Sequence, residues 1–211
     1  MSFAGLSTPQ AASAPSGNQD IAQLLHRADE LSRQFRQNHS SSFNSVQSVQ
    51  SAYNQLQNLL ALPATPITRN RPEGGIRERG MVKVQETAEE ALSAIREDLG
   101  KMERDVEQLN ALLYNADLFL AQSGLALQHG LNPKEALSHV SGLFAQYQDE
   151  LIRLREVLAD FTSEQIGVDE FVAEWKTMKE VDKGQEAELS DLVDVLGSWG
   201  GSGGGGDMNI G

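Results

Sequence analysis

The sequence predicts an all-α protein: an elongated antiparallel coiled-coil hairpin with additional N- and C-terminal helices and disordered tails. Two observations predict this class. Apolar residues recur in alternating steps of four and three along two segments, and a corner of helix-capping residues joins those segments. Apolar stripes with this period are buried against another helix. The composition agrees, because 39% hydrophobic and 6% aromatic residues suit a buried seam better than a globular core.

The N-terminal part is expected to be a disordered tail followed by helices. Residues 1–19 are rich in Ala, Ser, Pro and Gly, and they lack the basic start and apolar run of a secretory signal. Residues 20–61 carry an apolar stripe that breaks at 38–42 and resumes at Val46, four residues out of register. Clustered Ser and Asn favour a turn between two helices there. A stutter within one continuous helix is the alternative.

Residues 62–80 are predicted to be a linker, because Pro and Gly punctuate them. Four arginines make this the basic stretch of an otherwise acidic chain: Arg69, Arg71, Arg77 and Arg79. The stretch is interpreted either as a solvated linker or as an electrostatic contact. Its counterpart would then be an acidic partner or the acidic half of the same chain.

Residues 81–161 are predicted to form the long helical hairpin. Its first helix runs from about Val82 to His129 along a heptad stripe of Ala88, Leu92, Ile95, Leu99, Met102, Val106, Leu109 and Leu113. Gly130 suits the end of that helix, while Asn132, Pro133 and Glu135 suit the start of the next. The returning helix continues to Phe161 with Leu137, Val140, Phe144, Tyr147, Leu151, Leu154, Val157 and Leu158 in its stripe.

Two apolar regions of the first helix are predicted to need a partner beyond the hairpin. The returning helix has about 29 residues and covers only residues 101–129, which leaves Ala88, Leu92, Ile95 and Leu99 uncovered. Either the Val46–Leu60 helix folds back onto this seam or another polypeptide covers it. Residues 112–127 are apolar on nearly all sides, so they form either the densest core or the main docking surface.

Residues 162–199 are predicted to form short C-terminal helices, and the Gly-rich residues 200–211 a flexible tail. The first helix should span Val168 to about Val181. The second segment, 186–199, places Leu189, Leu192 and Leu196 at the spacing of helix-in-groove anchors, interleaved with acidic residues. It either packs on the protein's own bundle or docks into a separate groove.

The sequence contains no residue pattern that predicts catalysis, a cofactor or a metal. There is no cysteine, and none of the four histidines has the i, i+4 pairing of a helical zinc site. The carboxylates are spread along helix surfaces and do not converge on a cleft. Residues 81–211 carry ten Lys or Arg against twenty-five Asp or Glu, which argues against direct nucleic-acid binding. No apolar run reaches the length of a membrane span.

These observations predict a non-catalytic coiled-coil scaffold subunit of a multi-protein complex, in the cytoplasm or nucleus. Its partners would be other coiled-coil subunits, in a hetero-complex more than a homo-oligomer. The alternatives are a helical adaptor that presents the acidic C-terminal segment, for example in vesicle trafficking, and a self-assembling structural protein. The predicted protein-interaction residues are Leu92, Ile95, Leu99, Leu112, Leu113, Leu118, Phe119, Leu120, Leu189, Leu192, Leu196 and Trp199.

Overall fold

The computed structural model describes residues 17–63, 75–122 and 132–200, and over these residues the protein is helical, without a strand. The helices are α1 (Gly17–Leu60), α2 (Ile76–Gln122), α3 (Pro133–Thr162), α4 (Val168–Trp175) and α5 (Lys183–Gly200). The all-α class predicted from the sequence is therefore confirmed.

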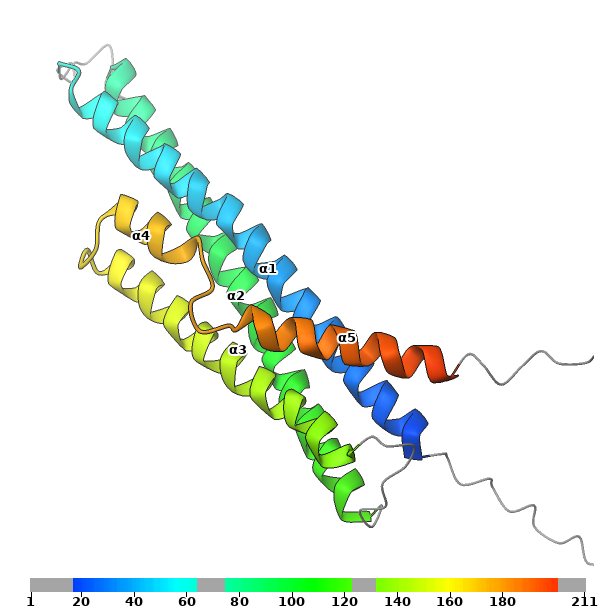
Figure 1. The fold of residues 1–211 in the computed structure, drawn as a ribbon. Helices are drawn as coiled ribbons and strands as arrows, with labels where there is room; N and C mark the ends of the chain where they lie inside the picture. The colour runs from blue at the N-terminus through cyan, green and yellow to red at the C-terminus, as the bar shows by residue number, and fades with distance from the viewer. Residues whose placement is uncertain (1–16, 64–74, 123–131, 201–211) are drawn as a thin grey trace, which may run out of the picture.

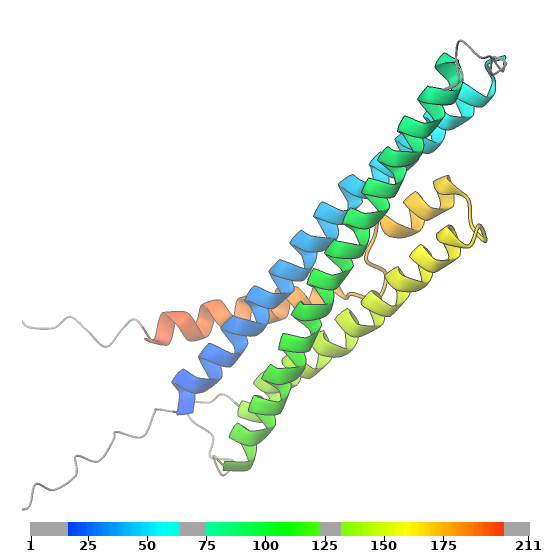
Figure 2. The same ribbon diagram turned by 180° about the vertical axis from the view of Figure 1, so that it is seen from behind.

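The molecule is a long antiparallel helix pair to which a shorter set of helices is attached (Figures 1 and 2). Helices α1 and α2 lie side by side over most of their lengths, and theirs is the most extensive helix packing in the fold. Helix α3 runs along the later part of α2, while α4 and α5 pack on α1 and α3. The end formed by the close of α1 and the start of α2 projects beyond the other helices.

Helix α1 is continuous, so the predicted turn at residues 38–42 is wrong. Buried residues of α1 follow two interleaved series of sevens that pass through the polar stretch without losing register: Ile21, Ala28, Phe35, Ser42 and Val49, and Leu25, Ser32, His39 and Val46. Three of these buried heptad positions hold polar residues, so the stripe is interrupted when apolar residues alone are considered: Ser32, His39 and Ser42. The stripe therefore has no shift of register, and neither a turn nor a stutter is needed.

The seam that the sequence left uncovered is buried within the chain. Leu92, Ile95 and Leu99 belong to the hydrophobic core, and α1 lies alongside this part of α2 (Figure 2). The fold-back alternative is therefore the correct one. The dominant hairpin is α1–α2, and the predicted α2–α3 pair is the lesser contact.

Several predicted boundaries differ from the structure. Helix α2 begins at Ile76, six residues before the predicted Val82, so the end of the predicted linker is helical. Helix α4 ends at Trp175, well before Val181, because residues 176–182 form an irregular connector to α5. The predicted helix end at His129 and the corner residue Gly130 lie outside the described residues.

The start of α3 agrees with the sequence. The Asn132 side chain accepts a hydrogen bond from the backbone N–H of Lys134 at 3.1 Å, and Pro133 is the first helical residue. Asn at the cap and Pro in the first turn satisfy or remove N–H donors that a helix start leaves unpaired.

Within the described residues, no helix is long and apolar enough to cross a membrane.

Candidate functional site

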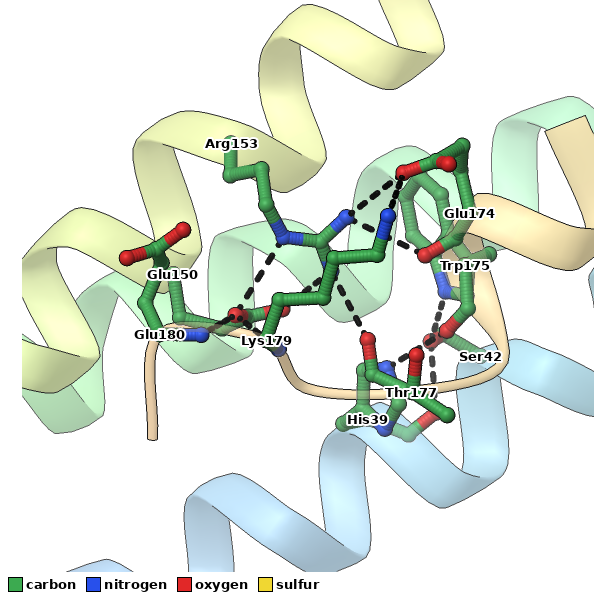
Figure 3. Close-up of polar contacts among 9 residues, drawn as sticks. All are labelled: His39, Ser42, Glu150, Arg153, Glu174, Trp175, Thr177, Lys179 and Glu180. Atoms are coloured by element: carbon green, nitrogen blue, oxygen red, sulfur yellow. Dashed lines mark hydrogen bonds and ion pairs between the residues drawn. The ribbon is translucent and has the colours of Figure 1, made fainter. Parts of the chain in front are cut away.

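A cluster of polar contacts, buried at its centre, joins the C-terminal helices to the long ones (Figure 3). We call it the polar latch, and it consists of His39, Ser42, Glu150, Arg153, Glu174, Trp175, Thr177, Lys179 and Glu180. These residues come from α1, from α3, and from α4 with its connector to α5. The latch therefore brings together three segments that are far apart in the sequence.

Glu150 is the centre of the latch. Its side chain has no exposed surface, and its carboxylate accepts the backbone N–H groups of Lys179 and Glu180, each at 2.9 Å. Arg153, one helical turn later, pairs with the same carboxylate. A buried carboxylate is tolerated only when it is paired and hydrogen-bonded, and here both conditions are met.

Arg153 also fixes the connector between α4 and α5. Its guanidinium donates to the carbonyl oxygens of Glu174 at 3.1 Å and Thr177 at 3.0 Å. Irregular backbone leaves carbonyl groups without helical partners, and a guanidinium can supply up to five donors. Glu150 and Arg153 together therefore satisfy two N–H groups and one C=O group of the connector, and one C=O group at the end of α4.

Three further latch contacts involve α4 and α1. The Trp175 indole N–H donates to Ser42 Oγ at 2.9 Å, and Ser42 Oγ donates to the His39 carbonyl at 2.7 Å. His39 Nε2 lies 2.9 Å from the Trp175 carbonyl oxygen, which can only accept, so this nitrogen carries the proton. Burial lowers the pKa of His39, because a charged imidazole is disfavoured there.

A second polar cluster attaches α5 to α1 and α3. The Tyr147 hydroxyl donates to the buried Glu186 carboxylate, and Ser32 Oγ lies 2.6 Å from the same hydroxyl oxygen. Arg36 approaches the other Glu186 oxygen at 3.1 Å. Burial and the neighbouring Glu186 raise the pKa of Tyr147 well above its ordinary value, so its hydroxyl stays protonated.

The geometry of these clusters suits attachment of helices. One open cavity, of about 480 Å³, lies between the projecting ends of α1 and α2 and is lined by residues such as Leu59, Gly80 and Val84. Another, of about 320 Å³, lies beside Asn38 and Asp105. Neither is lined by a member of either polar cluster. Among the described residues, no group of three His, Asp or Glu side chains is placed to hold a metal ion.

The predicted interaction residues fall into three structural groups. Leu92, Ile95 and Leu99 are buried in the core, as are Leu189 and Leu196 of α5. A second group near the end of α2 is half-buried or exposed: Leu112, Leu113, Leu118, Phe119 and Leu120. Leu192 is half-buried, and the side chain of Trp199 lies outside the described residues. Near the end of α2, Leu118 is therefore the exposed member of the predicted set, whereas Leu112, Leu113, Phe119 and Leu120 pack against the core.

The exposed face near the end of α2 carries a second heptad stripe. Ala111, Tyr114, Leu118 and Ala121 are spaced by three, four and three residues and are all exposed. We call these four residues the α2 seam. Tyr114 is 65% exposed and Leu118 40%. Asp117 is the only charged residue from Gln108 to Gln122, so little charge would be desolvated if a helix covered this face.

The sequence does not predict the latch, and it predicts the α2 seam only as part of an all-round apolar zone. Glu150 and Arg153, three residues apart on one helix, were the available signal for a buried ion pair, but the same spacing is common on solvated helices. Comparison of the chain with protein-family models, curated proteins and solved structures gave no match.

Proposed function

We propose that this chain is a non-catalytic scaffold subunit of a multi-protein complex, and that a partner helix binds along the α2 seam. The observation that carries the proposal is the exposed 3-4-3 spacing of Ala111, Tyr114, Leu118 and Ala121. A second stripe at coiled-coil spacing, on the face opposite the buried one, fits a helix that joins other helices on both sides.

The partner that fits this seam is an amphipathic helix with its own heptad stripe. Small Ala111 and Ala121 flank the larger Tyr114 and Leu118, which gives the alternating relief into which side chains of a facing helix can pack. Tyr is favoured at interface hot spots because its ring buries a large area and its hydroxyl keeps a polar contact. Other coiled-coil subunits, in the cytoplasm or nucleus, are the proposed source of this helix.

The adaptor alternative has less support. It requires Leu189 and Leu196 to be available as anchors for a separate groove, yet both are buried against this chain's own helices. An acidic docking helix would first have to leave the fold. The scaffold proposal requires no such rearrangement, because Tyr114 and Leu118 are already exposed.

The proposal is tested by affinity purification from the native source with quantitative mass spectrometry. The wild-type chain is compared with the double variant Tyr114→Glu/Leu118→Glu and with Ile152→Glu. Ile152 is a matched control, because it is 45% exposed and lies on α3, away from the α2 seam.

We expect one or more stoichiometric partners that are retained by the wild type and by Ile152→Glu but lost by the double variant. Thermal unfolding of all three proteins verifies that the fold is intact. If the wild type recovers no stoichiometric partner, or if the double variant retains every partner of the wild type, the proposal is wrong.

A further inference from the structure

The C-terminal arm, which we define as residues 168–200, is attached to the rest of the protein on one side only. It comprises α4, the connector 176–182 and α5. Within the described residues, the Cα atoms of its helices α4 and α5 come within 8 Å of α1 and α3 but not of α2. The close backbone packing of α2 is therefore with α1 and α3 and with neither helix of the arm.

The arm fills a groove between α1 and α3 with aromatic and aliphatic side chains. Phe171 and Trp175 are fully buried, and Phe171 stacks on Phe161 of α3 with ring centroids 4.3 Å apart. The rings of Phe35 and Tyr147 are also fully buried, and their centroids are 4.5 Å apart. A groove lined by such side chains would be unstable if left open, so an arm must occupy it.

The polar contacts in the groove select the occupant. Glu150 needs two backbone N–H donors, and Tyr147 needs the carboxylate supplied by Glu186. A generic amphipathic helix would leave these buried groups unpaired, which costs free energy. The groove therefore fits this arm, from its own chain or from a second copy.

The turn that leads into the arm is strained. Glu164 has φ of 61°, the only positive value at a non-glycine residue among the described positions. The turn is tight, since the N–H groups of Gln165 and Ile166 both point to the Asp160 carbonyl. A residue with a side chain is disfavoured in this left-handed conformation, and a strained hinge favours exchange of the element that follows it.

We propose that the C-terminal arm exchanges between two copies of this chain, giving a dimer in which each arm lies in the α1–α3 groove of the other copy. Exchange preserves every arm contact, including the latch, and releases the strain at Glu164 when the hinge opens. This goes beyond the proposed scaffold function and uses a different surface, so either proposal can fail alone.

The test uses single-cysteine variants, which is possible because the chain has no cysteine of its own. Gln50 on α1 and Asp169 on α4 are joined by a 2.9 Å hydrogen bond, and both side chains lie near the surface. Full-length Gln50→Cys and Asp169→Cys proteins, with tags of different mass, are unfolded together, refolded at low and high concentration, and treated with a short bismaleimide. The pair Gln146→Cys and Gln185→Cys tests α5 in the same way, since these side chains are 2.7 Å apart.

The control pair is Arg27→Cys with Gln108→Cys, whose native side chains join α1 to α2 at 2.6 Å. We expect covalent heterodimer from both arm pairs, several-fold above the control pair and increasing with concentration. Heterodimer from the arm pairs at or below the control level at every concentration would overturn the proposal.

Glu164→Gly should lower the yield of cross-linked heterodimer from the arm pairs about fivefold for each hinge, which is equivalent to about 1 kcal/mol. An unchanged yield would contradict the role given to Glu164.

Discussion

Glu150 contributes to the fold through two kinds of partner at once, a guanidinium and two backbone N–H groups. Replacing it with Ala should lower the free energy of unfolding by about 3–5 kcal/mol, because two backbone N–H groups would lose their acceptor and the largely buried Arg153 would keep only Glu174, at 3.6 Å, as a counter-charge. Urea denaturation measures this change.

The matched control for Glu150 is Glu103, which pairs with Arg155 across α2 and α3 at 2.7 Å while both side chains are nearly half exposed. Glu103→Ala should cost no more than about 1 kcal/mol, because water screens an exposed pair. Equal losses from the two substitutions would show that the latch is not the main anchor of the arm.

His39 should make stability depend on pH. Its pKa is lowered in the folded state by burial, against the opposing effect of its hydrogen bond to the Trp175 carbonyl. Glu150 favours the charged imidazole and Arg153 disfavours it. The unfolded chain therefore takes up this proton first, so stability is complete above about pH 6.5 and declines as the pH falls below it.

The measurement is the urea midpoint of the wild type and of His39→Gln at a series of pH values from 8 to 5. The decline between about pH 6.5 and 5 should be smaller in the variant, which has no imidazole to protonate. The pKa of Asp105 is raised by burial, but this group is present in both proteins and cancels from the difference. Parallel curves would contradict the role assigned to His39.

Glu164 offers a direct measure of backbone strain. Glycine adopts positive φ without the steric cost that any side chain incurs. Glu164→Gly should therefore be more stable than Glu164→Ala by about 1 kcal/mol in urea denaturation. Equal stabilities would mean that the turn after α3 is relaxed in solution.

Helix α1 shows how a regular element can be hidden by its own polar residues. Buried heptad positions can hold Ser32, His39 and Ser42 because α3, α4 and α5 supply hydrogen-bond partners for them. The sequence around these three residues does not predict those distant partners. Local propensity alone favoured a turn, and tertiary hydrogen bonds reversed that preference. The start of α3, in contrast, was readable because the Asn132 cap is a local interaction.

The packing of the C-terminal arm was the part of the fold least predictable from the sequence. Its apolar residues predicted helices, but not where they attach, because Glu150 and Glu186 carry no sign of burial in the sequence. The uncovered stretch of α2 was recognised correctly as needing a partner. Sequence spacing could not decide between α1 and another polypeptide, since any heptad helix satisfies that requirement.

The continuity of α1 can be tested at Ser41, an exposed residue in the middle of the helix. Ser41→Pro should cost about 3 kcal/mol or more, because proline removes a helical hydrogen bond and clashes with the preceding turn. Ser41→Ala should be neutral or slightly stabilising, since alanine has the higher helix propensity. Urea denaturation and circular dichroism measure both effects. A Ser41→Pro protein with wild-type stability would instead support a turn at 38–42.

The molecule as a whole is a rod with apolar side chains at both ends of its long helices. Leu60, Leu62, Ile76 and Val82 are exposed at the projecting α1–α2 end, and Tyr114 and Leu118 near the other end of α2. Helix α3 lies beside the later part of α2 as far as its end, and α4 and α5 lie beside the middle of the rod. Such a distribution fits a subunit that holds other helices at its ends, which is how the proposed scaffold would act.

The α2 seam can be examined in the assembled state by site-specific photocrosslinking. Leu118→Cys and Ile152→Cys proteins, each labelled with a thiol-reactive photocrosslinker, are returned to the source extract and irradiated, and the adducts are mapped by mass spectrometry. We expect adducts from position 118 onto one helical segment of a partner chain, and none from position 152. No adduct at 118, or the same adducts from both positions, would contradict the binding of a partner helix along this seam.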